Sequence, residues 1–211
     1  MKLQTFFDTT IELGIKNGPR NAKQIQRLLK EVREEYDKLS DKEKKIFDKE
    51  RLTNPFLDTR IVNGDPDQNV SIALAGIDVE ESEILMAAEL NRRAGMPGCV
   101  LKKGEQVDLL AAHHPVGRGL IDLTKVMDVQ AEVFVKHGVP VNIAEKLLEP
   151  RIRKIERGLS PVNHYRAVDI ARLLGFAYVC LHTVADNQVH AFLEAYMVKK
   201  KPYYVKDVLD A

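Results

Sequence analysis

The first part of the chain carries apolar positions at helical spacing with charged residues between them. Two such clusters follow one another, and they comprise Phe6, Phe7, Ile11, Leu13 and Ile15, and then Ile25, Leu28, Leu29, Val32 and Tyr36. Asn17-Gly18-Pro19 separates them, because Gly and Pro both interrupt a helix. Ser40 with Glu43 forms a capping box that opens a third short helix, ending near Glu50. We therefore predict that residues 1–66 form a helical N-terminal extension.

The pattern changes after a loop rich in turn residues, Asn63 to Asp67. Short apolar runs then alternate with longer amphipathic ones. The predicted strands are Val70–Ile77, Val107–Ala112, Val139–Ile143 and Phe176–Leu181, and the predicted helices are Glu80–Ala94, Val126–His137, Ala144–Arg157, His164–Leu174 and Asp186–Val198. This alternation predicts an α/β lobe over residues 67–211, with a mostly parallel sheet and helices on both of its faces.

Composition narrows the class of protein. The chain has 211 residues, with 32 Lys and Arg against 31 Asp and Glu and a net charge of +1, so nothing favours a nucleic-acid partner. No apolar run approaches the about 20 residues of a membrane span, and residues 1–20 do not resemble a secretory signal. Two widely separated cysteines, Cys99 and Cys180, are typical of reduced thiols in a cytoplasmic protein.

Two predicted strands end in residues that bind metals. His113-His114-Pro115 follows one strand, and His182 and Asp186 follow another. In an open parallel sheet, ligands gather beyond the carboxyl ends of the strands, so both groups are expected at one rim. Imidazole and carboxylate ligands together suit zinc, manganese, iron or nickel. The sequence therefore predicts a site for divalent metal ions, with His113, His114 and Asp186 as ligands.

Each of these residues also has a structural explanation. The histidine pair can be a turn, Asp186 can be the N-cap of the following helix, and His182 can be a buried histidine bonded to a carbonyl group. Their coincidence at one rim favours the metal site.

Weaker signals surround this predicted site. Gly117-Arg118-Gly119 can approach an anion, and His164 and Arg166 lie at the start of a helix. His190 and Glu194 have the i,i+4 spacing of a helical metal pair, which is more often a solvated pair.

Three segments together carry a resemblance to a known family. ALAGID at 73–78, AHHPVGRGL at 112–120 and CLHTVADN at 180–187 resemble the Nif-three-like family, with its His-His-Pro after one strand and His-Thr-x-x-Asp after another. The helical extension and the stretch PVNHYRAVDIARLL at 161–174 resemble a bacterial and archaeal branch of that family.

The resemblance implies a dinuclear metal site between two α/β lobes, in subunits that often form homo-oligomeric hexameric rings. It implies that His113 and His114 bind the two metals, that Asp186 binds one of them, and that His182 lies just behind these ligands. Some members are labelled GTP cyclohydrolase I type 2, and others are described only as interaction partners of transcription factors. Members of this branch continue into a second lobe with a C-terminal His and acid, so this chain is expected to hold only part of the ligand set and to bind metal more weakly.

Two functions are consistent with these features. The first is a metal-dependent hydrolase acting on a small molecule, with His182 and His164 as proton-transfer candidates and Arg118 and Arg166 as substrate-binding candidates. The alternative is a non-catalytic interaction module in which any metal is structural and the N-terminal extension contacts a partner.

Overall fold

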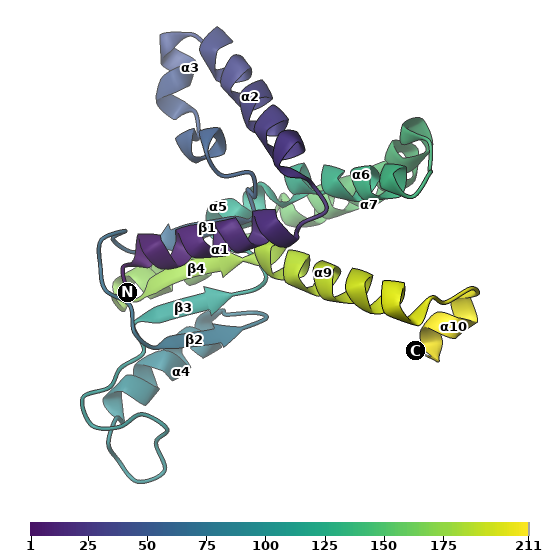
Figure 1. Cartoon of the computed structure of the whole chain (residues 1–211). Helices are drawn as coiled ribbons and strands as arrows, with labels where there is room; N and C mark the ends of the chain where they lie inside the picture. The colour runs from purple at the N-terminus through teal and green to yellow at the C-terminus, as the bar shows by residue number, and fades with distance from the viewer. Residues whose placement is uncertain (211) are drawn as a thin grey trace.

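A four-stranded sheet forms the centre of the protein, seen here in a computed structural model that describes residues 1–210 (Figure 1). The strand order is β1-β4-β3-β2, in which β2, β3 and β4 are parallel and β1 runs antiparallel to β4 at one edge. The strands are β1 (Thr59–Asn63), β2 (Ala73–Gly76), β3 (Leu109–Ala112) and β4 (Ala177–Leu181). The prediction of an α/β fold with a mostly parallel sheet is confirmed.

Helices account for most of the remaining chain. In chain order they are α1 (Leu3–Asn17), α2 (Ala22–Lys38), α3 (Asp41–Ile46), the 3-10 helix η1 (Lys49–Leu52), α4 (Glu81–Arg92), α5 (Gly117–Ile121), the 3-10 helix η2 (Leu123–Val126), α6 (Asp128–Lys136), α7 (Val141–Leu159), α8 (Arg166–Leu173), α9 (His182–Lys200) and α10 (Val205–Leu209). No helix within residues 1–210 is long and apolar enough to cross a membrane.

Both faces of the sheet are covered, because alternate residues of the strands point to opposite sides. On one face, α4 and α8 pack against a core that includes Ile84, Leu110 and Tyr178. On the other face, α1 places Leu3 against Leu109, Ala111, Ala177 and Val179. The N-terminal helix is therefore one of the two layers that bury the sheet.

Helix α1 also packs closely on α9, the helix that follows β4. A Cβ atom at Gly14 would lie 2.6 Å from the Val184 side chain, so only glycine permits this approach. The side chain of Asn187 donates to the Gly14 carbonyl at 2.9 Å. These contacts hold the first turns of α9 in place, and His182 and Asp186 lie on those turns.

Three details of the predicted elements were wrong. Residues 139–143 are not a strand, because the chain passes Pro140 and enters α7 at Val141, burying Ala144 and Leu148 at helical spacing. Helix α9 begins at His182, immediately after β4, and not at Asp186. Residues 1–66 are not wholly helical, because they contain β1.

The helices α2 and α3 project away from the sheet, and the α6–α7 hairpin and α9 extend on another side (Figure 1). The predicted capping box at Ser40 is confirmed, since its backbone N–H donates to Glu43 at 2.8 Å and its hydroxyl accepts from the Glu43 N–H at 3.4 Å. Helix α2 buries only Ile25 and exposes its charged residues. Helix α3 buries none of its residues, so both helices are largely exposed to solvent.

Candidate metal centre

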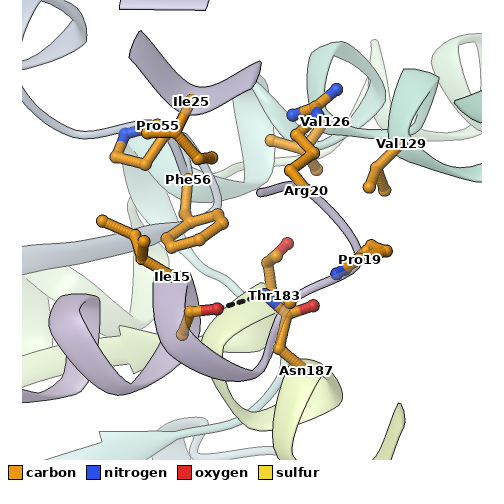
Figure 2. A pocket seen from close by; sticks show the side chains of 12 residues that line it. Ile15, Pro19, Arg20, Ile25, Pro55, Phe56, Val126, Val129, Thr183 and Asn187 are labelled. Carbon is orange, nitrogen blue, oxygen red and sulfur yellow. Dashed lines mark hydrogen bonds between the residues drawn. The ribbon is translucent and has the colours of Figure 1, made fainter. Parts of the chain in front are cut away.

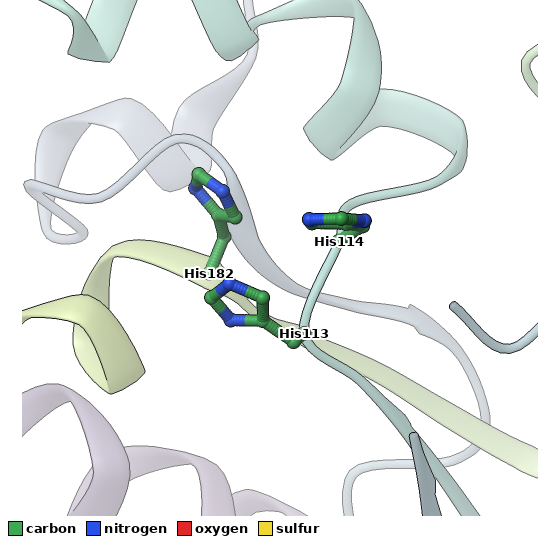
Figure 3. Close-up of side chains that lie close together, drawn as sticks. All are labelled: His113, His114 and His182. Atoms are coloured by element: carbon green, nitrogen blue, oxygen red, sulfur yellow. The ribbon is translucent and has the colours of Figure 1, made fainter. Parts of the chain in front are cut away.

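Three histidines meet at the carboxyl ends of the parallel strands. His113 and His114 directly follow β3, and His182 directly follows β4. One ligand atom from each of these three residues lies within 4.8 Å of the other two, and all three rings face a common space (Figure 3). The prediction that the two sequence segments meet at one rim is confirmed.

The backbone explains why both adjacent histidines reach this space. The hydrogen bonding between β2 and β3 continues beyond the ends of both strands. The His113 N–H donates to the Gly76 carbonyl, and the His114 N–H donates to the Ile77 carbonyl. The chain then bends at His113 and His114. Residues in a straight strand point to opposite faces, but this bend brings the two ring centroids within 5.1 Å. The His113 and His182 rings stack at 4.8 Å.

Asp186 supplies a carboxylate to the same space. It lies one helical turn beyond His182 on α9, so both side chains share a face of that helix. Its Oδ1 lies 3.5 Å from Nε2 of His113, and its Oδ2 lies 4.0 Å from Nε2 of His182. The N-cap explanation of Asp186 is wrong, because α9 begins four residues earlier.

Two further carboxylates orient the histidines from behind. Asp58 Oδ2 accepts from Nδ1 of His182 at 2.8 Å and from the Thr183 hydroxyl at 2.7 Å. Asp78 Oδ1 lies 2.8 Å from Nδ1 of His114. Because Nδ1 of each ring faces a carboxylate, Nε2 is the nitrogen that remains for another partner. Carboxylates hold metal-binding histidines in this way in many proteins.

The antiparallel register of β1 places Asp58 beside His182. Thr59 pairs with Leu181, so the residues just outside the ladder, Asp58 and His182, lie opposite each other. Asp58 is 0% exposed. A buried carboxylate requires partners, and His182 and Thr183 provide them.

The electrostatic environments of His113 and His182 differ. Burial, and then the positive charge of His182, lower the pKa of His113 below its ordinary value. Burial also acts to lower the pKa of His182, but its hydrogen bond to Asp58 and the charges of Asp58 and Asp186 outweigh burial and raise that pKa. In the metal-free protein, His182 therefore keeps its proton to higher pH than His113 does.

The donor set fits a divalent metal ion. Three imidazoles and one carboxylate suit zinc, manganese, iron or nickel, and catalytic zinc sites use three such ligands and leave one position open. His113, His114, His182 and Asp186 are the residues that would hold the metal. The resemblance to the Nif-three-like family gives His182 a place behind the ligands, whereas in this structure its ring lies among them.

The structure places the other candidate residues outside this group. Arg118 pairs with the buried Asp122 at 2.8 Å, and Arg166 pairs with Glu81 and Glu80. His164 is connected to this region through its backbone carbonyl, which accepts from Gly117 N–H at 2.7 Å.

Sequence reasoning missed Asp58 and Asp78 as part of this centre. For Asp78 a signal existed, because an acid directly after the first predicted strand belongs to the same rim. For Asp58 there was no such signal. It directly precedes β1, a strand within a segment that was predicted to be helical, and its partner His182 lies 124 positions away.

These features define an α/β lobe with a histidine-rich candidate metal centre at the end of its parallel strands. A comparison with solved structures finds this fold in a NIF3 superfamily protein from Sphaerobacter thermophilus, with a TM-score of 0.55 and 22% sequence identity. The match covers 73% of this chain and 52% of that protein, so this chain spans about half its length. No protein-family model and no curated protein sequence matches the chain. The fold expected from the Nif-three-like resemblance is thus confirmed.

Proposed function

We propose that this chain is the metal-binding lobe of a Nif-three-like, metal-dependent hydrolase. The observation that supports this most directly is the convergence of three imidazoles from two strands on one space, within 4.8 Å. A purely structural role for histidines does not require their nitrogen atoms to face one another. A bound cation gives these mutually facing lone pairs a common partner.

The side chains of this lobe divide the work between them. His113, His114, His182 and Asp186 hold the metal, which when bound lowers the pKa of a water molecule so that hydroxide is available near neutral pH. Asp58 and Thr183 keep His182 in the orientation that directs Nε2 to the centre. Of the two proton-transfer candidates, His164 is not in this group and His182 belongs with the ligands.

The number of donors limits how many ions this chain can hold. Three of these four donors can bind one tetrahedral ion and leave its fourth position open. The second ion that the resemblance implies needs ligands in addition to these four. We therefore expect this chain to bind one ion.

Calorimetric titration with Zn²⁺ and Mn²⁺ tests the proposal. We expect about one equivalent of metal to bind the wild-type chain, and His114→Ala to weaken binding by about 100-fold or more. His137→Ala is the matched control, because His137 is an exposed histidine outside the cluster. Equal binding by the wild type and His114→Ala, or no binding by either, would contradict the proposal.

We also propose that the protein is a cytoplasmic homo-oligomer acting on a small molecule. Both cysteines are free thiols, as in a reducing compartment. Helix α9 exposes several large apolar side chains, as expected of a contact between subunits: Val189, Phe192, Leu193 and Val198. Light scattering of the purified chain tests the oligomer, and a monomer at all concentrations would contradict it.

The projecting helix α2 supports the alternative of an interaction module. Deletion of residues 1–60 would not test it cleanly, because it removes α1 from the sheet and Asp58 from the metal centre. The exposed residues Arg27 and Lys30 offer a better test. If Arg27→Glu with Lys30→Glu abolishes assembly while metal binding is unchanged, α2 is a contact surface.

A further inference from the structure

The two edges of the sheet differ in how far the chain itself protects them. Strand β1, at one edge, has a break in register between Ile61 and Asn63, as at a β-bulge, and contacts α5. Bulges and covering elements keep an edge strand from pairing with another chain. Strand β2, at the other edge, pairs regularly with β3, carries no proline or charged residue, and leaves Ala73 and Ala75 exposed (Figure 1).

The backbone of β2 has unused hydrogen-bonding groups on its outer side. The carbonyls of Ile72 and Gly76 accept from N–H groups of the β3 segment. Because successive residues of a strand direct their backbone groups to opposite sides, Ala73 and Ala75 direct theirs away from β3. Among residues 1–210, neither alanine has a backbone partner on that side. Two N–H and two C=O groups are therefore available at this edge.

The β1–β4 end of the sheet, in contrast, is closed by the chain itself. Helices α1 and α9 pack together there, and the turn between α1 and α2 lies over them, with Ile15 and Phe56 close to Asn187 (Figure 2). The hollow beneath this turn has about 10 Å³ of open space, which holds at most about one water molecule. Within residues 1–210, the β2 edge is therefore the side of the sheet that is left open.

The hydrogen-bonding pattern of the β2 edge is complementary to itself. When a second copy places its own β2 antiparallel to the first, with a two-fold axis at Leu74, Ala73 of each copy lies opposite Ala75 of the other. Each of these two pairs exchanges both of its N–H···O=C bonds, so the contact gains four hydrogen bonds. Such a self-complementary surface is what a two-fold symmetric dimer requires.

Neighbouring registers of this pairing are less favourable. A shift by two residues in one direction places Ala75 opposite Ser71, whose N–H already donates to Asp108 at 2.9 Å. A shift in the other direction places Ala73 opposite Ile77, whose carbonyl already accepts from the N–H of the second histidine of the pair at 2.8 Å. The register centred on Leu74 is therefore the one that uses the available groups fully.

The side chains on the α4 face support the same pairing. Leu74 is only partly buried and packs against the core that contains Leu110 and Tyr178. On the two-fold axis, the two Leu74 residues form a pair without hydrogen bonds, in which the Cα atoms lie about 4.5 Å apart. Helix α4, on this face of the sheet, exposes Leu85 and Met86. The apolar core beneath β2 can therefore continue from one copy into the other.

An unrelated peptide matches this edge less well than a second copy does. Peptides that add to a sheet edge gain specificity from pockets that receive alternate side chains. The exposed side chains of β2 are those of Ala73 and Ala75, which are too small to form such pockets. A second copy, by contrast, gains both the four hydrogen bonds and the contact between the Leu74 side chains.

We propose that two copies of this chain pair through their β2 strands, antiparallel and with the two-fold axis at Leu74, so that their sheets become one continuous sheet. The inference rests on the homo-oligomer proposed above and names its contact surface. It leaves the exposed apolar residues of α9 free for a second contact, which an assembly larger than a dimer needs.

Amide hydrogen exchange of the full, metal-free chain tests this pairing without any substitution. NMR spectra are compared at protein concentrations below and above the midpoint of association. We expect the exchange of the Ala73 and Ala75 amides to slow by at least about tenfold as the chain associates. The Leu74 amide is the internal control, because it faces β3 and should be protected at every concentration.

A pair of substitutions at one position provides a second test. Ala75→Pro removes the outward N–H and leaves the bonding to β3 in place, since proline is tolerated on the open side of an edge strand. Because the dimer loses two of its four hydrogen bonds, we expect association to weaken by about tenfold or more. Ala75→Ser keeps the N–H and is the matched control, with an expected change of less than about twofold.

Sedimentation equilibrium measures the association, and circular dichroism establishes that both variants fold. If Ala75→Pro does not fold, the exchange experiment on the wild-type chain decides alone.

The outcomes separate this inference from the proposals on which it rests. Association with fast exchange of the Ala73 and Ala75 amides, or equal association of Ala75→Pro and the wild type, overturns the β2 pairing and assigns the oligomer to another surface. A monomer at every concentration overturns both the pairing and the homo-oligomer. The metal titration is independent of each result, because exchange is measured without metal.

Discussion

Two clusters of charged and titratable side chains lie in this protein, and they differ in how completely their members are paired. In the first, named here the Arg60 cluster, Arg60 is 3% exposed and its guanidinium contacts Asp48 at 2.6 Å, Glu50 at 2.8 Å and Asp122 at 3.4 Å. Asp122 in turn accepts from Lys125 at 2.7 Å. Every charge in this cluster has an opposite charge beside it.

The histidine cluster is paired on one side only. Asp58 and Asp78 occupy Nδ1 of His182 and His114, while the other ring nitrogens face one another and Asp186, which is 56% exposed. A network in which all charges are matched stabilises the fold. A group that is held in place yet left incomplete toward solvent is a candidate site for a ligand.

We expect the two clusters to differ most in how much their mutation lowers the free energy of unfolding. Arg60→Ala leaves partly buried carboxylates without their cation, so we expect the free energy of unfolding to fall by about 3–5 kcal/mol. Urea denaturation measures this. Arg92→Ala, which breaks an exposed pair with Glu89, is the control and should change stability far less. Equal effects of the two substitutions would show that the Arg60 cluster is not structural.

Removal of a histidine from the other cluster should alter metal binding and leave stability nearly unchanged. His113→Ala deletes one donor, and we expect the dissociation constant for Zn²⁺ to rise by about 100-fold. The carboxylate nearest to His113 is that of Asp186, which is 56% exposed, so its loss leaves no buried charge unpaired. We expect urea denaturation of the metal-free variant to stay within about 1 kcal/mol of the wild type. Large destabilisation with unaltered metal affinity would assign His113 to the structure alone.

A smaller effect is expected when the support of His182 is weakened. Asp58→Asn keeps the shape of the side chain but removes the charge that holds the Nδ1 proton of His182, so metal affinity should fall by about tenfold. Nitrogen NMR of the imidazoles should also show a change in the tautomer or protonation of His182. An unchanged imidazole spectrum would contradict the positioning role of Asp58.

The smallest effect concerns pH. The pKa of His182 is raised, chiefly because its hydrogen bond to Asp58 and nearby negative charge outweigh burial, so metal must displace a proton below that pKa. Burial and the charge of His182 lower the pKa of His113, so His113 loses its proton at a lower pH than His182 does. Between the two pKa values, metal affinity should therefore rise with pH, and it should level off above the pKa of His182. Calorimetry across a pH series measures this slope, and a flat profile would contradict it.

Features of the structure that depend on local sequence patterns could be predicted from the sequence, and features that depend on long-range contacts could not. Strands β3 and β4 are short apolar runs, and the local pattern identifies them together with the histidines at their ends. Strand β1 has no such pattern, because it is an edge strand of five residues with only part of its surface buried. Its pairing with β4 is a long-range contact, and this pairing brings Asp58 to His182.

The same distinction explains the misplaced start of α9. The apolar run of β4 ends at Leu181, and the chain enters the helix without a connecting loop. No capping residue marks this junction, since the structure has no side-chain cap at Leu181. The sequence therefore predicted His182 and Asp186 as neighbours at a rim, but not as residues on one helical face.

An anomalous difference map from crystals grown with Zn²⁺ tests the central claim most directly. The account predicts a peak at the histidine cluster, at about 2.0–2.2 Å from Nε2 of His182 and from further donors among His113, His114 and Asp186. A map from metal-saturated crystals with no peak at these residues, or with its peaks only elsewhere, would contradict it.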